Sequence, residues 1–167
     1  MNKENIFSMI SKMSEEELIN LARSTSDVEI LNILAENEDY KVRWAVAENE
    51  YTSADMFAML AKNDEFIVRC AVAKNENTPV ETLAVLAQDK HWLIRQTVAL
   101  NENTSVDVLA MLAKDEAIDV RYAVAENSHT SYNTLIMLTK DKNVFISKTA
   151  EEALKVRKEK DKTCIER

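Results

Sequence analysis

The stretch VRCAVAKNENTPVETLAVLAQD, residues 68–89, decides the fold because most of it recurs elsewhere in the chain. The related stretches are VRWAVAENEYTSADMFAMLAKN from residue 42, IRQTVALNENTSVDVLAMLAKD from residue 94 and VRYAVAENSHTSYNTLIMLTKD from residue 120. Each stretch begins 26 residues after the one before it. A fixed period of this length is typical of repeat architectures, in which every module packs against its neighbours.

The apolar spacing within one repeat, residues 63–88, predicts two helices joined by tight turns. In the first half, apolar residues follow the i, i+3, i+4 spacing of one helix face: Val68, Ala71 and Val72. The second half carries a similar stripe: Leu83, Leu86 and Ala87. We expect each helix to have about ten residues, a length that is marginal in water without tertiary packing. The modules must therefore bury their stripes against one another.

Polar residues at the repeat boundary predict where the helices end and begin. The chain contains no glycine, and Asn75 follows the first helix. Asparagine is the best substitute for glycine as the left-handed residue that ends a helix. The equivalent asparagines are Asn49, Asn101 and Asn127. Thr78 is predicted to cap the second helix, with Glu81 completing a capping box. The related pairs are Thr52 with Asp55, Thr104 with Asp107, Thr130 with Asn133, Ser26 with Glu29 and Ser14 with Glu17.

The register of the repeats predicts an all-α solenoid of 26-residue two-helix modules with atypical capping modules at its ends. One core column reads Val46, Val72, Val98 and Val124, and another reads Leu34, Leu60, Leu86, Leu112 and Leu138. We expect a single repeat domain over residues 1–167. Its parts are an N-terminal cap and half repeat (1–36), four full repeats (37–140), a degenerate repeat (141–154) and a charged tail (155–167).

The string V-R-x-A-V-A-x-N-x-x-T-P-x-x-x-L-x-x-L-A-x-D resembles the leucine-rich repeat variant family over roughly residues 26–152. The resemblance implies a right-handed superhelix related to HEAT-type solenoids, in which an α-helix pairs with a second short helix that is often 3₁₀. Some relatives carry a cysteine cluster that holds an iron–sulfur centre, and this chain has no such cluster, so no cofactor follows. The family has no common catalytic activity, which implies a binding scaffold.

Composition bears on the class of partner. The net charge is −8; residues 155–167 hold six basic and three acidic residues, a net +3, so residues 1–154 carry −11. This disfavours the alternative of a nucleic-acid-binding HEAT-like solenoid, which needs a basic face. Two cysteines and no signal-peptide pattern favour a reducing cytoplasm. No catalytic motif or metal-ligand spacing is found, so we expect no enzyme, metal site or cofactor.

Arginines form the sharpest polar column of the repeat: Arg43, Arg69, Arg95 and Arg121. One interpretation is a ladder that binds anions or acidic peptides. The favoured interpretation is structural, with each arginine paired to the residue six positions earlier: Asn37, Asn63, Asp89 and Asp115.

Three columns of the first helices are predicted to face outward and vary in residue type. Their candidate partner-binding residues are Trp44, Ile67, Cys70, Leu93, Gln96, Leu100 and Tyr122. Exposed aromatic and aliphatic side chains in one strip indicate a contact surface, whereas the alternative is that curvature of the stack half-buries them. We expect a protein or peptide partner, no nucleic acid and no membrane. A monomer is expected, with an end-to-end dimer as the alternative.

Overall fold

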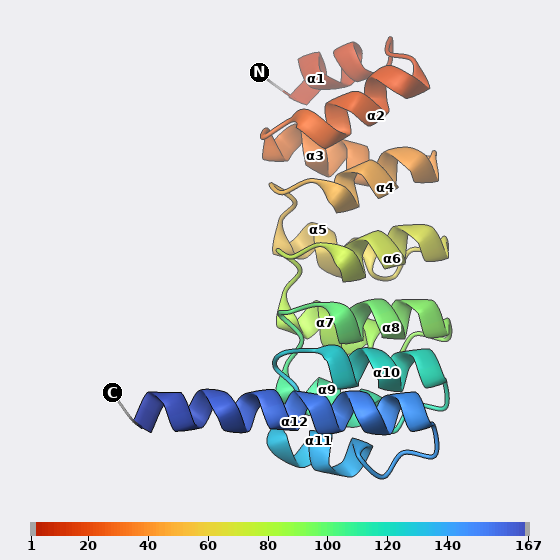
Figure 1. Ribbon diagram of the computed structural model, residues 1–167. Coiled ribbons are helices and arrows are strands. Elements are labelled where there is room, and N and C mark those ends of the chain that lie inside the picture. The colour runs from red at the N-terminus through yellow and green to blue at the C-terminus, as the bar shows by residue number, and fades with distance from the viewer. Residues whose placement is uncertain (1–2, 166–167) are drawn as a thin grey trace. The chain divides into compact units, whose positions relative to one another are not determined.

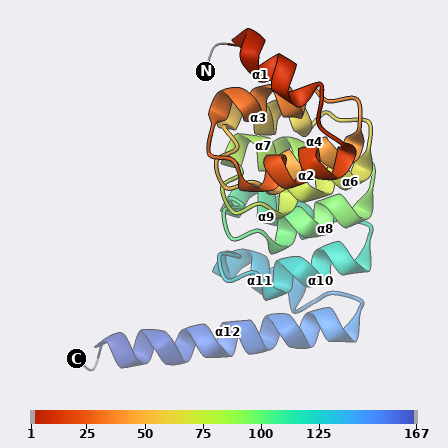
Figure 2. The ribbon, with the colours of Figure 1, turned by 90° about the horizontal axis from the view of Figure 1, so that it is seen from above.

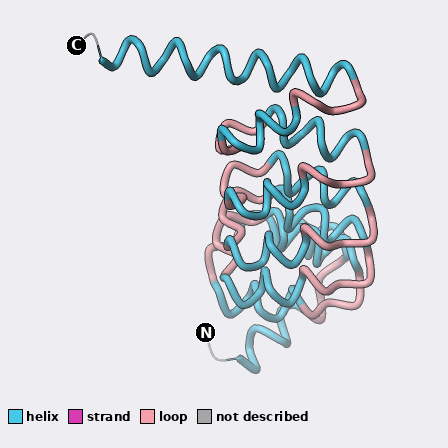
Figure 3. The backbone as a smooth tube through the Cα atoms, turned by 90° about the horizontal axis from the view of Figure 1, so that it is seen from below, coloured by secondary structure: helices cyan, strands magenta, loops and turns pink. Residues whose placement is uncertain are grey.

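The computed structural model describes the backbone of residues 3–165 and the side chains of residues 4–159. Within this part of the chain the regular elements are helices joined by loops, without a strand (Figure 3). The helices are α1 (Lys3–Ile10), α2 (Glu15–Ser24), α3 (Val28–Ala35), α4 (Tyr40–Glu48), α5 (Ala54–Leu60), α6 (Phe66–Lys74), α7 (Val80–Leu86), α8 (Trp92–Leu100), α9 (Val106–Leu112), α10 (Ile118–Glu126), α11 (Tyr132–Leu138) and α12 (Val144–Ile165). The chain divides into two compact units, Met1–Thr82 (unit 1) and Leu83–Arg167 (unit 2).

Unit 1 has two layers of helices. In the first layer, α2 packs on α4 and α4 packs on α6, so these three helices follow one another (Figure 1). The second layer holds α3 and α5, which contact each other and the helices of the first layer, and α1 packs on α3. Each module therefore contributes one helix to each layer.

Unit 2 repeats this arrangement, with α8, α10 and α12 in succession and α9 and α11 beside them. α12 has 22 residues and packs on both α10 and α11. Its C-terminal part extends past the shorter helices of this unit (Figure 2). The boundary predicted between residues 154 and 155 is not a structural break, because one helix runs through it. The tail side chains beyond residue 159 lie outside the described residues.

The predicted core columns are buried in both units. Val46 and Val72 are fully buried in unit 1, as are Val98 and Val124 in unit 2. The leucine column is buried as well: Leu34, Leu60, Leu86, Leu112 and Leu138. Full burial of each such side chain is worth roughly 1.5–3 kcal/mol relative to exposure, which short isolated helices cannot obtain. The all-α solenoid class predicted from the repeat is confirmed.

The second helix of each module is shorter than predicted. α5, α9 and α11 have seven residues each instead of about ten, whereas α4, α6, α8 and α10 have nine. These helices begin one residue later than predicted because the capping residue is the serine that follows the threonine. The hydroxyl groups of Ser53, Ser105 and Ser131 each accept from the main-chain N–H three residues further on. These second helices are α-helices, not 3₁₀-helices.

The threonine caps were wrongly predicted. Instead of accepting from the second helix, the Thr130 hydroxyl donates a 2.6 Å hydrogen bond to the main-chain carbonyl of Val124, at the end of the first helix. The same contact joins Thr52 to Val46, Thr78 to Val72 and Thr104 to Val98. These buried threonines satisfy helix-end carbonyls that have no partner within the helix.

At the N-terminal modules, one capping prediction holds and one does not. The predicted capping box at Ser14 and Glu17 is confirmed, with both reciprocal hydrogen bonds present. The residue that caps α3 is Asp27 and not Ser26, because the Asp27 carboxylate accepts from the N–H groups of Glu29 and Ile30.

The asparagines do not adopt the left-handed conformation that the sequence predicted. Asn49 has φ −74° and ψ 137°, and no described residue has a positive φ. Its side chain explains its presence: Nδ2 donates to the carbonyls of Ala22 (2.7 Å) and Thr25 (2.9 Å), and Oδ1 accepts from the N–H of Tyr51 (2.7 Å). A residue with an extended backbone has no need of glycine's conformational freedom. The asparagine is explained by the hydrogen bonds of its side-chain amide.

This asparagine ladder recurs within both units. In unit 1, Asn75 Nδ2 donates to the carbonyls of Ala47 (2.9 Å) and Asn49 (3.2 Å). In unit 2, Asn127 makes the same pair of bonds to Ala99 (2.8 Å) and Asn101 (3.2 Å). Within each unit the ladder therefore ties a module to the module before it.

Arg157 takes over the ladder's role on α12. Twenty-six residues after Asn127 the chain has Ala153, which lacks an amide. Arg157, one turn further along α12, donates to the main-chain carbonyls of Ser128 and Thr130. The long guanidinium side chain thus contacts carbonyls three residues further along than Ala125 and Asn127, which are the equivalents of the residues that the amide contacts in the regular modules.

Candidate partner-binding surface

The arginine column connects adjacent modules. Arg95 Nη1 donates to the carbonyl of Asp89 (2.8 Å), while its Nε and Nη2 donate to the two carboxylate oxygens of Asp115 at 2.6 and 2.9 Å. The pairing predicted six residues back therefore involves a main-chain oxygen. The carboxylate partner lies 20 residues ahead, in the next module, and the Asp89 carboxylate accepts from the N–H of His91 instead.

The same geometry appears at Arg121, whose Nη1 donates to the Asp115 carbonyl and whose Nε and Nη2 donate to the Asp141 carboxylate. Arg69 is 6% exposed, and its Nη1 donates to the carbonyls of Asn63 and Asp64. Arg95 and Arg121 therefore each form a bidentate pair with a largely buried carboxylate of the next module.

Arg43 departs from this pattern. The residue 20 positions ahead is Asn63, whose Oδ1 accepts from Arg43 Nη2 at 3.5 Å and also from the N–H of Glu65. Arg43 Nε is buried and has no hydrogen-bond partner among the described residues. The amide supplies one acceptor where Asp115 and Asp141 supply two.

The electrostatics of the bidentate pairs follow from their burial and hydrogen bonds. Burial acts to raise the pKa of Asp115, but hydrogen bonds from Arg95 and from the Ala117 N–H bring that pKa below its usual value. The hydrogen bond from Arg121 lowers the pKa of Asp141. Both carboxylates are therefore charged at neutral pH and hold the guanidinium groups in place.

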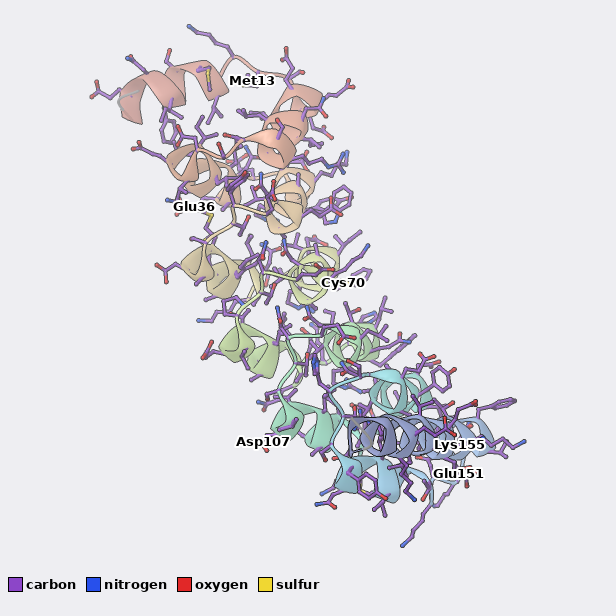
Figure 4. All side chains as sticks on the ribbon, turned by 60° about the vertical axis from the view of Figure 1, so that its left-hand side comes forward. Met13, Glu36, Cys70, Asp107, Glu151 and Lys155 are labelled. Carbon is purple, nitrogen blue, oxygen red and sulfur yellow. The ribbon has the colours of Figure 1, made fainter. Side chains whose placement is uncertain are left out.

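The unit 1 candidates lie on the first-helix layer. Ile67 of α6 is 39% exposed, whereas Trp44 of α4 and Cys70 of α6 are half-buried. Figure 4 shows Cys70 on α6, in the first-helix layer, and Glu36 in the other layer, at the end of α3. The guanidinium carbon of Arg23 lies 4.8 Å from the centre of the Trp44 ring, a cation–π contact.

An open pocket of about 620 Å³ adjoins these residues in unit 1. Its lining comes from the C-terminal ends of α4 and α6 and the loops that follow: Glu48, Glu50, Ala71, Lys74, Asn75, Glu76 and Asn77. Trp44 and Glu48 are four residues apart on α4, and Ile67 and Ala71 are four apart on α6, so each pair shares one helix face. The pocket and the apolar candidates of unit 1 are therefore neighbours.

In unit 2 the candidates are Leu93, Gln96 and Leu100 on α8 and Tyr122 on α10. Leu100 is 48% exposed, and the other three are half-buried. Tyr122 lines an open pocket of about 500 Å³ between α10 and α12, together with Glu126, Ala153, Val156 and Arg157 among others.

The two units differ in net charge. Unit 1 has eight Lys and Arg residues against sixteen Asp and Glu residues, a net −8, whereas unit 2 has thirteen of each. The net charge of the whole chain, −8, is therefore equal to that of unit 1.

Sequence reasoning missed the interactions that bind the modules together. The constant spacing of the asparagines and threonines was visible in the sequence, but local capping rules assigned these residues to their own helices. Arg157 carries no periodic signal at all, because it lies outside the columns of the repeat. For the arginine column, the sequence identified the arginines but not their carboxylate partners, which were predicted six residues earlier and lie 20 residues ahead in the next module.

Comparisons with known proteins agree with this architecture. The model of the family described as leucine rich repeat variant matches residues 68–91, the repeat that decided the fold. The resemblance to this family is confirmed. A solved structure described as "a leucine-rich repeat variant with a novel repetitive protein structural motif" matches with a TM-score of 0.72 and 25% sequence identity. The match covers 92% of this chain and 62% of the chain in that solved structure, so this chain spans less than two thirds of its length.

No curated protein matches the chain. Among the described residues, none of the helices combines the length and the apolar character that crossing a bilayer requires.

Proposed function

We propose that this protein is a non-enzymatic cytoplasmic scaffold that binds a protein partner through the outward face of the first helices of its repeats. The repeat-scaffold fold supports the proposal, because modules that share an interior leave one face of each helix layer for recognition. A stacked-helix surface can hold an extended segment of another protein without any catalytic group.

The contrast between inward and outward columns is the observation that supports this proposal most. The valine and leucine columns keep one residue type from module to module and are buried. The outward columns change type and include aromatic and aliphatic residues with accessible surface: Trp44, Ile67, Leu93, Leu100 and Tyr122. Aromatic residues in particular supply much of the binding free energy at protein interfaces.

Nucleic-acid binding is the second candidate, favoured only by the relationship between these repeats and HEAT-like solenoids. It requires a surface that attracts phosphates. Unit 1 carries a net −8 and unit 2 a net charge of zero, which favours a protein partner instead.

Affinity capture with paired variants tests the proposal. Proteins captured from the native cell by the wild-type chain would be compared with those captured by the Trp44→Ala/Tyr122→Ala variant. We expect this variant to lose its partner while its melting temperature stays within roughly 5 °C of the wild type. The matched control is Met59→Ala/Tyr132→Ala, which removes one large exposed side chain of each unit from the second helices α5 and α11 and is expected to retain the partner.

Two results would contradict the proposal. Equal loss of the captured protein in both double variants would show that the first-helix face has no special role. Unfolding of the Trp44→Ala/Tyr122→Ala variant would assign these two side chains to the core.

A further inference from the structure

Unit 1 concentrates carboxylates beside its outward apolar side chains. Three of the residues that line its 620 Å³ pocket are glutamates, Glu48, Glu50 and Glu76, and Lys74 is the one basic residue in that lining. All three glutamates are exposed, so their charges face solvent. The pocket therefore has a net charge of −2 within a unit whose net charge is −8.

The same surface already holds a guanidinium group from its own chain. Arg23 lies over the Trp44 ring at 4.8 Å, and its Nε is 3.6 Å from a carboxylate oxygen of Glu48. An aromatic face next to a carboxylate binds arginine by combining a cation–π contact with an ion pair. This contact shows which chemistry the surface accommodates.

We infer that the surface of unit 1 formed by Trp44, Ile67 and the acidic pocket binds a partner segment that carries lysine or arginine side chains. The inference rests on the proposed function and adds the partner's chemical class. Basic side chains of the segment enter the pocket near Glu48, Glu50 and Glu76, and its apolar side chains contact Ile67 and the accessible part of Trp44. Charge complementarity of this kind accelerates association and rejects acidic competitors.

Peptide selection on the intact chain tests this inference without a known partner. The probe is a phage-displayed library of random twelve-residue peptides, from which the leading peptide is synthesised with a fluorescent label and titrated by anisotropy. We expect the selected peptides to have a positive net charge and their affinity to fall as sodium chloride is raised. Substituting citrulline for arginine in the peptide, which removes the charge and nearly preserves the shape, is expected to weaken binding.

Charge variants of the protein locate the contact. Glu48→Gln/Glu50→Gln/Glu76→Gln is expected to raise the dissociation constant of the peptide roughly tenfold or more. The control Glu36→Gln/Glu38→Gln/Asp64→Asn removes the same charge from another edge of unit 1, where these residues line a different pocket, and is expected to change the constant less than about twofold. Lys74→Glu is expected to tighten binding, which a merely disrupted fold cannot do.

The outcomes separate this inference from the proposed function. Selection of neutral or acidic peptides, or equal effects of the two triple variants, would overturn the inference and leave the scaffold proposal standing. Failure to select any peptide would count against both.

Discussion

At Asn127 a single side chain satisfies three main-chain groups. Its amide donates to the carbonyls of Ala99 and Asn101, and its oxygen accepts from the N–H of His129. The residue is 4% exposed, so water cannot easily replace these partners. Buried polar groups without a partner cost roughly 1–3 kcal/mol each, which makes this side chain important for the cohesion of neighbouring modules.

Replacing Asn127 with glycine distinguishes the ladder from a left-handed terminator. Because φ is −64°, glycine brings no conformational advantage at this position. We expect Asn127→Gly to lower the free energy of unfolding by about 2 kcal/mol, as measured by urea denaturation. The exposed neighbouring substitution Ser128→Gly, which keeps the ladder, is expected to cost less than about 1 kcal/mol. A stabilised Asn127→Gly protein would instead support the left-handed conformation.

Arg43 offers an opportunity to stabilise the chain. Its buried Nε has no partner because Asn63 provides one acceptor oxygen where the equivalent residue at Arg95 is Asp115. We expect Asn63→Asp to complete the bidentate pair and to raise the free energy of unfolding by about 1 kcal/mol.

The control for this substitution is Asn32→Asp, which adds the same charge at an exposed position of α3. Its effect on urea denaturation is expected to stay within about 0.5 kcal/mol. If the two substitutions changed stability equally, the geometry proposed for the Arg43 pair would be wrong.

At the scale of the helices, the ion pair between Arg121 of α10 and Asp141, just before α12, fixes one module on the next. Asp141 is nearly buried, and the hydrogen bond from Arg121 is the main cause of its lowered pKa. A carboxylate with a lowered folded-state pKa stabilises the fold above its unfolded-state pKa, and that contribution is lost as the pH falls through the folded-state value.

Asp141→Asn is therefore expected to have a pH-dependent effect. At pH 7 it should lower the free energy of unfolding by about 2 kcal/mol, because the guanidinium loses its charged acceptor. The difference from the wild type should begin to shrink as the pH falls below the ordinary pKa of 3.8, where the unfolded chain takes up a proton, and should be lost as the pH falls through the lower pKa of the folded carboxyl. Urea denaturation at a series of pH values from 7 downward measures this difference in the free energy of unfolding. The exposed α12 substitution Glu151→Gln serves as a control (Figure 4). A pH-independent difference would rule out the ion pair as its source.

The helices themselves were predictable, because each one follows from apolar spacing within a few turns of chain. The first helix of the repeat, α6, has nine residues, close to the length of about ten that the sequence predicts. The contacts between modules were not predictable in the same way. The hydroxyl of Thr130 and the amide of Asn127 had local partners available, and only the stacked arrangement showed that more distant carbonyls accept from them. The role of Arg157 could not be predicted, because this residue does not recur at the 26-residue period of the repeat.

At the scale of the whole molecule, the inward columns of the helices stabilise the fold, and we propose that the outward columns of the same helices serve recognition. Within each unit the inward residues of successive modules form one interior, and the asparagines and arginines connect the modules at their edges. The outward residues take no part in these ladders and differ between modules. The net charge of −8 on unit 1 then favours a basic partner over an acidic one.

Nitrogen–proton correlation spectra of the chain, recorded as the selected basic peptide is added, locate the contact surface most directly. We expect the largest shift changes at the Trp44 indole and at the main-chain amides of Glu48, Cys70 and Glu76, with small changes in α3 and α5. Changes concentrated in α3 and α5, with the Trp44 indole unmoved, would contradict recognition by the first-helix face.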